Sequence, residues 1–292
     1  MTLIVNTNLD AINAQRNLSS IGLELSKSFH RLSSGQRINS AGDDAAGLAL
    51  SNNFTSDIRG LEQARRNAQD AEAMLAVAEG GVRTIAKNLM RAHELGTQAG
   101  NDTYSYAERR LIRQEIAAIW KEIDRVAQST TFNGIEMLTL SAPKKLLIQV
   151  GSGNDTSTGS VDVLNIASAF GALTNFTLHL GTAGVPNNAA ANFLTSRVET
   201  ALLTVNDQLA RLGALQNRLQ GVVENIDISV QNLSSARSRI QDADMASETA
   251  NLTKHQLIQQ STLSVLTQAN LSPQGALRLL SATQPVEFPK SH

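Results

Sequence analysis

The chain has 292 residues, a net charge of −1 and no cysteine, and aromatic residues make up only 3% of it. The absence of cysteine excludes disulfides, zinc–thiolate sites and thiol catalysis, and the balanced charge argues against non-specific nucleic-acid binding, which needs a cationic surface. No run of 18 apolar residues occurs, so we expect no membrane span. The start has neither a basic n-region nor an apolar h-region, so we expect no cleaved signal peptide.

An amphipathic helix is predicted over residues 1–35. Apolar residues recur there at helical spacing, and Gly35 is a suitable C-terminal stop. A linker rich in Ser, Gly, Asn and Asp follows. Its Asp43-Asp44 pair is better explained as an N-cap for the next helix than as an acid–base site, because no strand–loop pattern typical of a pocket surrounds it.

Two long helices are predicted over 48–99 and about 191–240, each with an apolar stripe. Leu61 to Ala92 and Leu202 to Ile240 repeat apolar residues at steps of three and four, which requires partner helices. Between them, Ser105 and Glu108 fit a capping box for a helix that runs to about Gln128. These patterns predict a mainly α fold: a long antiparallel helical bundle or coiled coil built from both halves of the chain.

The middle of the chain has a different pattern. Strands are predicted over 146–150, 160–166 and 176–180, and Gly151 to Asp155 is predicted as a loop. After Asp242 a further amphipathic helix is expected, which Pro273 breaks or kinks.

These elements predict two domains. A terminal-helix domain combines residues 1–45 with 243–292, and a helical bundle covers 46–242 with a β-hairpin segment at about 140–190. An isolated helix is only weakly stable in water. We therefore expect the terminal helices to be disordered in the free subunit and to form a coiled coil only with partners.

Several segments together resemble bacterial flagellin, over roughly residues 1–150 and 195–280. They are Arg31–Gly35, Asp43–Ala49, Thr131–Gly134, Asn232–Ile240 and Gln268–Asn270. The short centre is similar to flagellins that lack large outer domains. Ser281 to His292 extend beyond the usual end of the family.

The resemblance implies a secreted, non-enzymatic structural subunit of the extracellular bacterial flagellar filament, which self-assembles into a helical tube for motility. No cofactor is implied. The alternative is the hook–filament junction (hook-associated) protein, which shares similar terminal helices. An enzyme or adhesin on a flagellin frame is a rival from another class, disfavoured by the short centre. The five histidines show no metal-ligand spacing.

The resemblance also implies partners. They are other copies of the chain, a cytoplasmic flagellin chaperone at the C-terminal helices, the flagellar type III export apparatus and the filament cap. Apolar positions on the terminal helices are the candidate polymerisation residues. They are Leu9, Ile12, Ile21, Leu25, Phe29, Leu32, Leu252, Leu263 and Leu266.

In part of the family, the first long helix and its neighbour are recognised by a vertebrate Toll-like receptor. The positions matching that surface here are Arg91, Glu94, Leu95 and, on the next helix, Glu115. A charged anchor beside an apolar side chain is a common arrangement in binding hot spots. The alternative is that Arg91 and Glu115 are solvated or form an ion pair between helices.

Overall fold

The computed structural model describes residues 8–139, 145–153, 163–167, 170–175, 177–180 and 187–281, with side chains described up to Leu271. Contacts divide the chain into two units. The terminal unit comprises Met1–Thr55 with Ser234–His292, and the bundle unit comprises Ser56–Leu233. Within the described residues, no helix has a segment both long and apolar enough to cross a bilayer.

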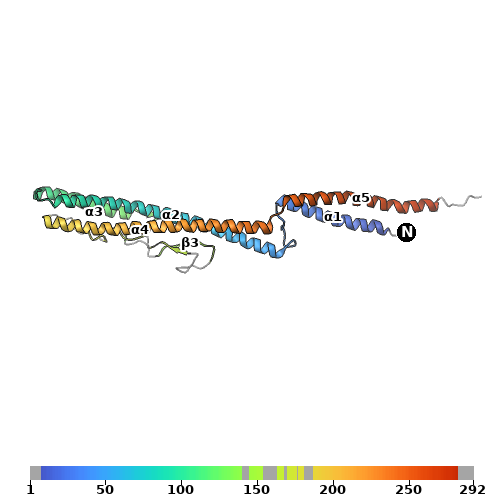
Figure 1. Cartoon of the computed structure of the whole chain (residues 1–292), viewed down its shortest axis with the longest axis horizontal. Coiled ribbons are helices and arrows are strands. Elements are labelled where there is room, and N and C mark those ends of the chain that lie inside the picture. The colour runs from blue at the N-terminus through green and yellow to red at the C-terminus, as the bar shows by residue number, and fades with distance from the viewer. Residues whose placement is uncertain are drawn as a thin grey trace, which may run out of the picture. The chain divides into compact units, whose positions relative to one another are not determined.

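Two helices, α1 (Leu9–Ser34) and α5 (Met245–Ser281), pack against each other in the terminal unit, as Figure 1 shows. Asn8 caps α1 by accepting a hydrogen bond from the amide of Ala11, and Gly35 ends it in the left-handed conformation at φ 71°. This confirms the predicted stop, because glycine adopts positive φ without a steric penalty. The predicted break at Pro273 is wrong, since α5 continues to Ser281.

Three helices run alongside one another in the bundle unit: α2 (Ala45–Ala99), α3 (Tyr106–Ser129) and α4 (Asn188–Gln241) (Figure 1). The two predicted stripes form one hydrophobic core with α3, in which Leu75, Ile85 and Leu89 of α2 are fully buried. Because Arg65 pairs with Asp227 while His93 pairs with Glu199, α2 and α4 are antiparallel. The predicted antiparallel bundle is thus confirmed.

The predicted helix starts are confirmed by their capping contacts. Ser105 Oγ accepts from the Glu108 amide at 3.4 Å, and Glu108 Oε2 accepts from the Ser105 amide at 2.7 Å, which is a capping box. At the start of α2, Asp44 Oδ1 accepts from the Gly47 amide at 2.9 Å. The Asp43-Asp44 pair therefore belongs to a helix start, as expected.

Small antiparallel β pairs occupy the middle of the chain: β1 (Thr131–Phe132) with β2 (Ile135–Glu136), and β3 (Leu147–Gln149) with β4 (Val163–Asn165). The first hairpin was not predicted from the sequence. Its two central residues, Asn133 and Gly134, both have positive φ, as a two-residue hairpin turn requires. The strand predicted at 176–180 is wrong for 177–180, which form a turn with His179 at φ 54°.

The middle segment packs closely on α2 at Gly81. A Cβ atom there would lie 2.5 Å from Thr130 Oγ1 and 2.8 Å from Leu138 Cδ1. The glycine therefore allows the segment after α3 to bury Met137 and Leu138 completely in the core. Segments from both halves of the sequence contribute to the bundle, so neither half alone contains the complete core.

Candidate assembly surfaces

The helices α1 and α5 form an antiparallel pair. Near the start of α1, Asn8 Nδ2 donates to the carbonyl of Ala269 at 2.7 Å. Near its end, Arg31 lies 3.7 Å from the carboxylate of Glu248. The described part of α1 buries only Ala14 and Ser28. The helices thus touch along a narrow line rather than around a thick core.

The structure divides the nine predicted polymerisation residues into two groups. Five are half-buried, and four, beginning with Leu9 at 59% exposed, have exposed side chains. The half-buried group is Ile21, Leu25, Leu32, Leu252 and Leu266, and the exposed group is Leu9, Ile12, Phe29 and Leu263. Leu9, Ile12, Phe29 and Leu263 are thus available to further partners.

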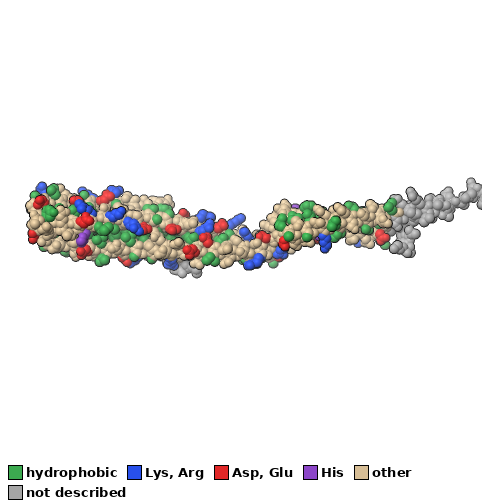
Figure 2. Space-filling view, turned by 45° about the horizontal axis from the view of Figure 1, so that its top comes forward, with side chains coloured by type: hydrophobic (Ala, Val, Ile, Leu, Met, Phe, Trp, Pro, Cys, Tyr) green, Lys and Arg blue, Asp and Glu red, His purple; other side chains and the backbone are tan. Residues whose placement is uncertain are grey.

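Further exposed apolar residues on the same pair lie outside the nine predicted polymerisation residues. Leu23 is 72% exposed, and Leu257, Ile258, Val265 and Leu271 of α5 are also exposed. Figure 2 shows hydrophobic side chains on the visible surface of this pair. The sequence showed an apolar stripe on each of the two helices. It did not show which side of each stripe stays exposed when the helices pair.

The connections next to the pair are fixed by hydrogen bonds within the terminal unit. The Arg37 amide donates to the Gln241 carbonyl at 2.7 Å, and the Ala243 amide donates to the Gly35 carbonyl at 3.0 Å. Burial opposes the ionisation of Asp43, but hydrogen bonds from Asn39 and Ser40 outweigh it and lower the pKa of that carboxyl group. The two linkers are therefore joined to each other rather than extended separately.

The candidate receptor residues lie in the bundle unit, where three of them form an ion-pair cluster. Arg91 Nη2 lies 2.8 Å from Glu115 Oε1 on α3, and Arg91 Nη1 lies 3.0 Å from Glu94 Oε2. The hydrogen bonds to Glu115 and then Glu94 raise the pKa of Arg91. The side chains of this cluster are exposed.

Leu95 belongs to the core and not to that surface. Its side chain is only 2% exposed and packs in the core cluster. The exposed feature at this place is thus a charged cluster that joins α2 to α3, without Leu95 as an exposed apolar side chain beside it.

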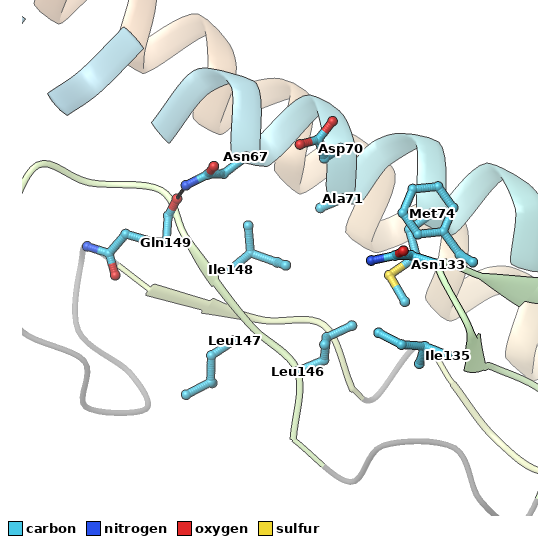
Figure 3. A pocket seen from close by; sticks show the side chains of 11 residues that line it. Asn67, Asp70, Ala71, Met74, Asn133, Ile135, Leu146, Leu147, Ile148 and Gln149 are labelled. Atoms are coloured by element: carbon cyan, nitrogen blue, oxygen red, sulfur yellow. Dashed lines mark hydrogen bonds between the residues drawn. The ribbon is translucent and has the colours of Figure 1, made fainter. Parts of the chain in front are cut away.

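A partly apolar hollow of about 390 Å³ opens on the bundle unit between α2 and the β segments (Figure 3). Its apolar lining includes Met74, Ile135 and Ile148, while Asn67 and Asp70 line it from α2. Asn67 Nδ2 donates to the Gln149 carbonyl at 3.0 Å, which holds β3 against the helix. Sequence reasoning missed this hollow, because only the packing of β3 on α2 creates it.

Comparison with protein families matches two regions of the chain. Residues 5–142 match the bacterial flagellin N-terminal helical region, and residues 195–280 match the bacterial flagellin C-terminal helical region. Together the matches cover well over half of the 292 residues.

Proteins that are similar to this chain along nearly its whole length are named as flagellins or flagellar filament core proteins. The flagellar filament 33 kDa core protein of Treponema phagedenis is 37% identical, with 95% of this chain and 100% of the relative covered. Flagellin of Bacillus subtilis strain 168 is 38% identical, with 94% and 99% covered. A crystal structure of Bacillus cereus flagellin is 28% identical over 55% of this chain and 88% of that one, with a TM-score of 0.47.

The matching regions carry both terminal helices and the long bundle helices described above. The full-length relatives are named as flagellins or filament core proteins, which favours flagellin over the hook–filament junction alternative. The chain belongs to the bacterial flagellin family, the non-enzymatic structural subunits that self-assemble into the extracellular flagellar filament.

Proposed function

We propose that this filament subunit joins other copies through the exposed apolar side chains of α1 and α5. The observation that supports this is the exposure of Leu9, Ile12, Phe29 and Leu263 although the two helices already pack on each other. Fully burying one large apolar side chain is worth about 1.5–3 kcal/mol. Contacts with neighbouring copies would supply that burial.

The same helices form the proposed switch between soluble subunit and polymer. Fixing the backbone costs about 1–2 kcal/mol per residue, and α1 offsets little of it within its own chain because it buries only Ala14 and Ser28. Residues 1–45 and 243–292 are accordingly proposed to be disordered in the dilute subunit. They become ordered as a coiled coil at the growing end of the filament.

Deletion of residues 1–35, or of 250–280, tests this proposal. Each deletion should leave the bundle unit folded, because its core lies within Ser56–Leu233, and should abolish polymerisation. Far-UV circular dichroism reports the fold, and electron microscopy of seeded subunits reports filaments. Filaments of normal length from either deletion variant would contradict the proposal.

Exposed amphipathic helices also require protection before assembly. We propose that a cytoplasmic flagellin chaperone binds α5, because its exposed residues Leu257, Ile258 and Leu263 form a surface suited to a hydrophobic groove. Export through the flagellar type III apparatus and addition below the filament cap complete the proposed route. Binding of purified chaperone should be lost when 250–280 are deleted and kept when 1–35 are deleted.

Recognition by a vertebrate Toll-like receptor is proposed for the exposed cluster of Arg91, Glu94 and Glu115 on the bundle unit. Arginine and acidic groups held in a fixed geometry support such an interface. Arg91→Ala with Glu115→Ala should reduce receptor signalling by monomers. The matched control removes the ion pair between Arg125 and Glu122 on α3. An equal response from both double variants would contradict the assignment.

A further inference from the structure

The hollow between α2 and β3 has the chemistry of a docking site for a single apolar side chain. Its volume of about 390 Å³ lies within the range of about 300–1,000 Å³ that is typical of pockets for small ligands. Met74, Ile135 and Ile148 supply apolar lining, and Asp70 adds a carboxylate from α2 (Figure 3). A suitable occupant therefore combines an apolar group with a positive charge.

The Asp70 side chain has no ion pair or hydrogen bond with any other described residue. Its helical neighbour Arg66, one turn earlier, instead donates to Gln63 at 2.7 Å. Within the described part of the chain, the carboxylate at the hollow therefore has no cationic partner, and a cation of another copy can pair with it.

The same unit exposes a side chain with the complementary chemistry. Phe193 at the start of α4 is 64% exposed, and the guanidinium carbon of Arg197 lies 5.3 Å from the centre of its ring. Among the described residues, Arg197 has no acidic partner. Other apolar residues of the bundle unit are exposed, such as Leu203 and Leu111, but a cation lies over the ring of Phe193.

The two features cannot meet within one chain. The start of α4 lies beside Gly96, since a Cβ atom on that glycine would be 3.0 Å from Leu194. Asp70 and Gly96 are on the same helix, and a rise of about 1.5 Å per residue separates them by about 39 Å. Contact between Phe193 and the hollow therefore needs a second copy.

We infer that Phe193 of one subunit inserts into the hollow beside Asp70 of a neighbouring subunit, with Arg197 paired to that Asp70. An interface between two different surfaces of identical copies extends into an open filament when the rotation between copies does not close into a ring. The inference rests on self-assembly of the chain and adds a specific axial contact between bundle units to the terminal-helix contacts.

Charge reversal at the two positions tests the contact. Asp70→Lys and Arg197→Glu, each alone, should raise the critical concentration for elongation about tenfold or more, because each places like charges together. Phe193→Ala should raise it about 30-fold, as expected for an aromatic anchor. The critical concentration is measured by sedimentation of seeded subunits, after circular dichroism has shown that each variant is folded.

A mixture of the two single variants provides the decisive result. In an alternating filament, Lys at position 70 meets Glu at position 197 at one contact, and Asp70 meets Arg197 at the next. The 1:1 mixture and the double variant D70K/R197E should both return to within about threefold of the wild type. Impairment of both single variants without rescue in the mixture would overturn the pairing.

Matched controls lie on the same helices. Glu72→Lys reverses an exposed charge two positions from Asp70, and Arg218→Glu does so on α4; neither residue has an ion pair among the described residues. Both controls should assemble like the wild type, and impairment equal to that of Asp70→Lys would overturn the inference. Wild-type protein that forms no filaments contradicts self-assembly itself, whereas normal filaments from all variants contradict only this contact.

Discussion

The terminal unit and the bundle unit are both helical but use their apolar residues in opposite ways. In the bundle unit, α2, α3 and α4 share a core in which Leu75, Ile116 and Leu212 are completely buried. In the terminal unit, two helices meet along one line, and Leu9, Leu23 and Phe29 remain exposed. The difference indicates that the bundle unit has a self-sufficient core, whereas the described part of the terminal unit leaves apolar surface exposed.

Removing the exposed stripe of α1 should produce the largest effect, and only on assembly. The triple variant Leu9→Ser, Ile12→Ser and Phe29→Ser removes side chains whose burial between copies is worth about 1.5–3 kcal/mol each. Sedimentation with seeds should detect no polymer, while the bundle unit melts as in the wild type. A control triple at exposed polar positions, Asn13→Ser, Ser20→Ala and Glu24→Gln, should assemble normally.

Truncating a core side chain of the bundle unit should instead lower the stability of that unit. Leu89→Ala removes a fully buried side chain and should lower the free energy of unfolding by about 2–5 kcal/mol. The adjacent Met90 is exposed, so Met90→Ala should change the free energy of unfolding by less than about 0.5 kcal/mol. Equal destabilisation by the two changes, measured by urea unfolding, would remove the distinction between the units.

The capping box should make a smaller contribution to the bundle unit. Ser105→Ala leaves the Glu108 amide without its side-chain acceptor and should cost about 1 kcal/mol of unfolding free energy. Ser196→Ala, at an exposed position within α4, is the control. A cost at Ser105 no larger than at Ser196 would show that α3 does not depend on its cap.

The smallest predicted effect is a pH dependence that arises in the bundle unit. A hydrogen bond from Gln216 Nε2 at 2.9 Å, assisted by Arg83, lowers the pKa of Glu79 from 4.5. Because the folded state has the lower pKa, this stabilisation is complete above about pH 4.5 and is lost as pH falls through the folded-state pKa.

Glu79→Gln should therefore weaken the acid dependence of unfolding, and so should Gln216→Ala, which removes the hydrogen-bond donor to Glu79. Urea unfolding between pH 6 and pH 3 measures both. An unchanged acid dependence in the Glu79 variant would show that the hydrogen bond from Gln216 does not favour the ionised over the protonated form of Glu79.

The sequence was sufficient to predict the elements whose residues repeat at helical spacing. The stripes on α2 and α4, the stop at Gly35 and the cap at Ser105 all follow from local chemistry, and the structure confirms them. The β1–β2 hairpin was missed, because two-residue strands contain too few residues to show alternation.

The candidate surfaces depend on packing between distant segments, which limits prediction. Leu95 matches a surface motif but lies in the core because it is on the buried side of α2. The hollow beside Asp70 forms because β3 packs on α2, and β3 begins at Leu147, 77 positions after Asp70 in the sequence. No local pattern specifies such contacts.

Hydrogen exchange in dilute subunits and in filaments tests the central claim most directly. The amides of α1 and α5 should exchange rapidly in the dilute subunit and become protected in the filament, while the core amides of the bundle unit are protected in both. Equal protection of α1 and α5 in both states would contradict the account, because the helices would then need no other copy to become ordered.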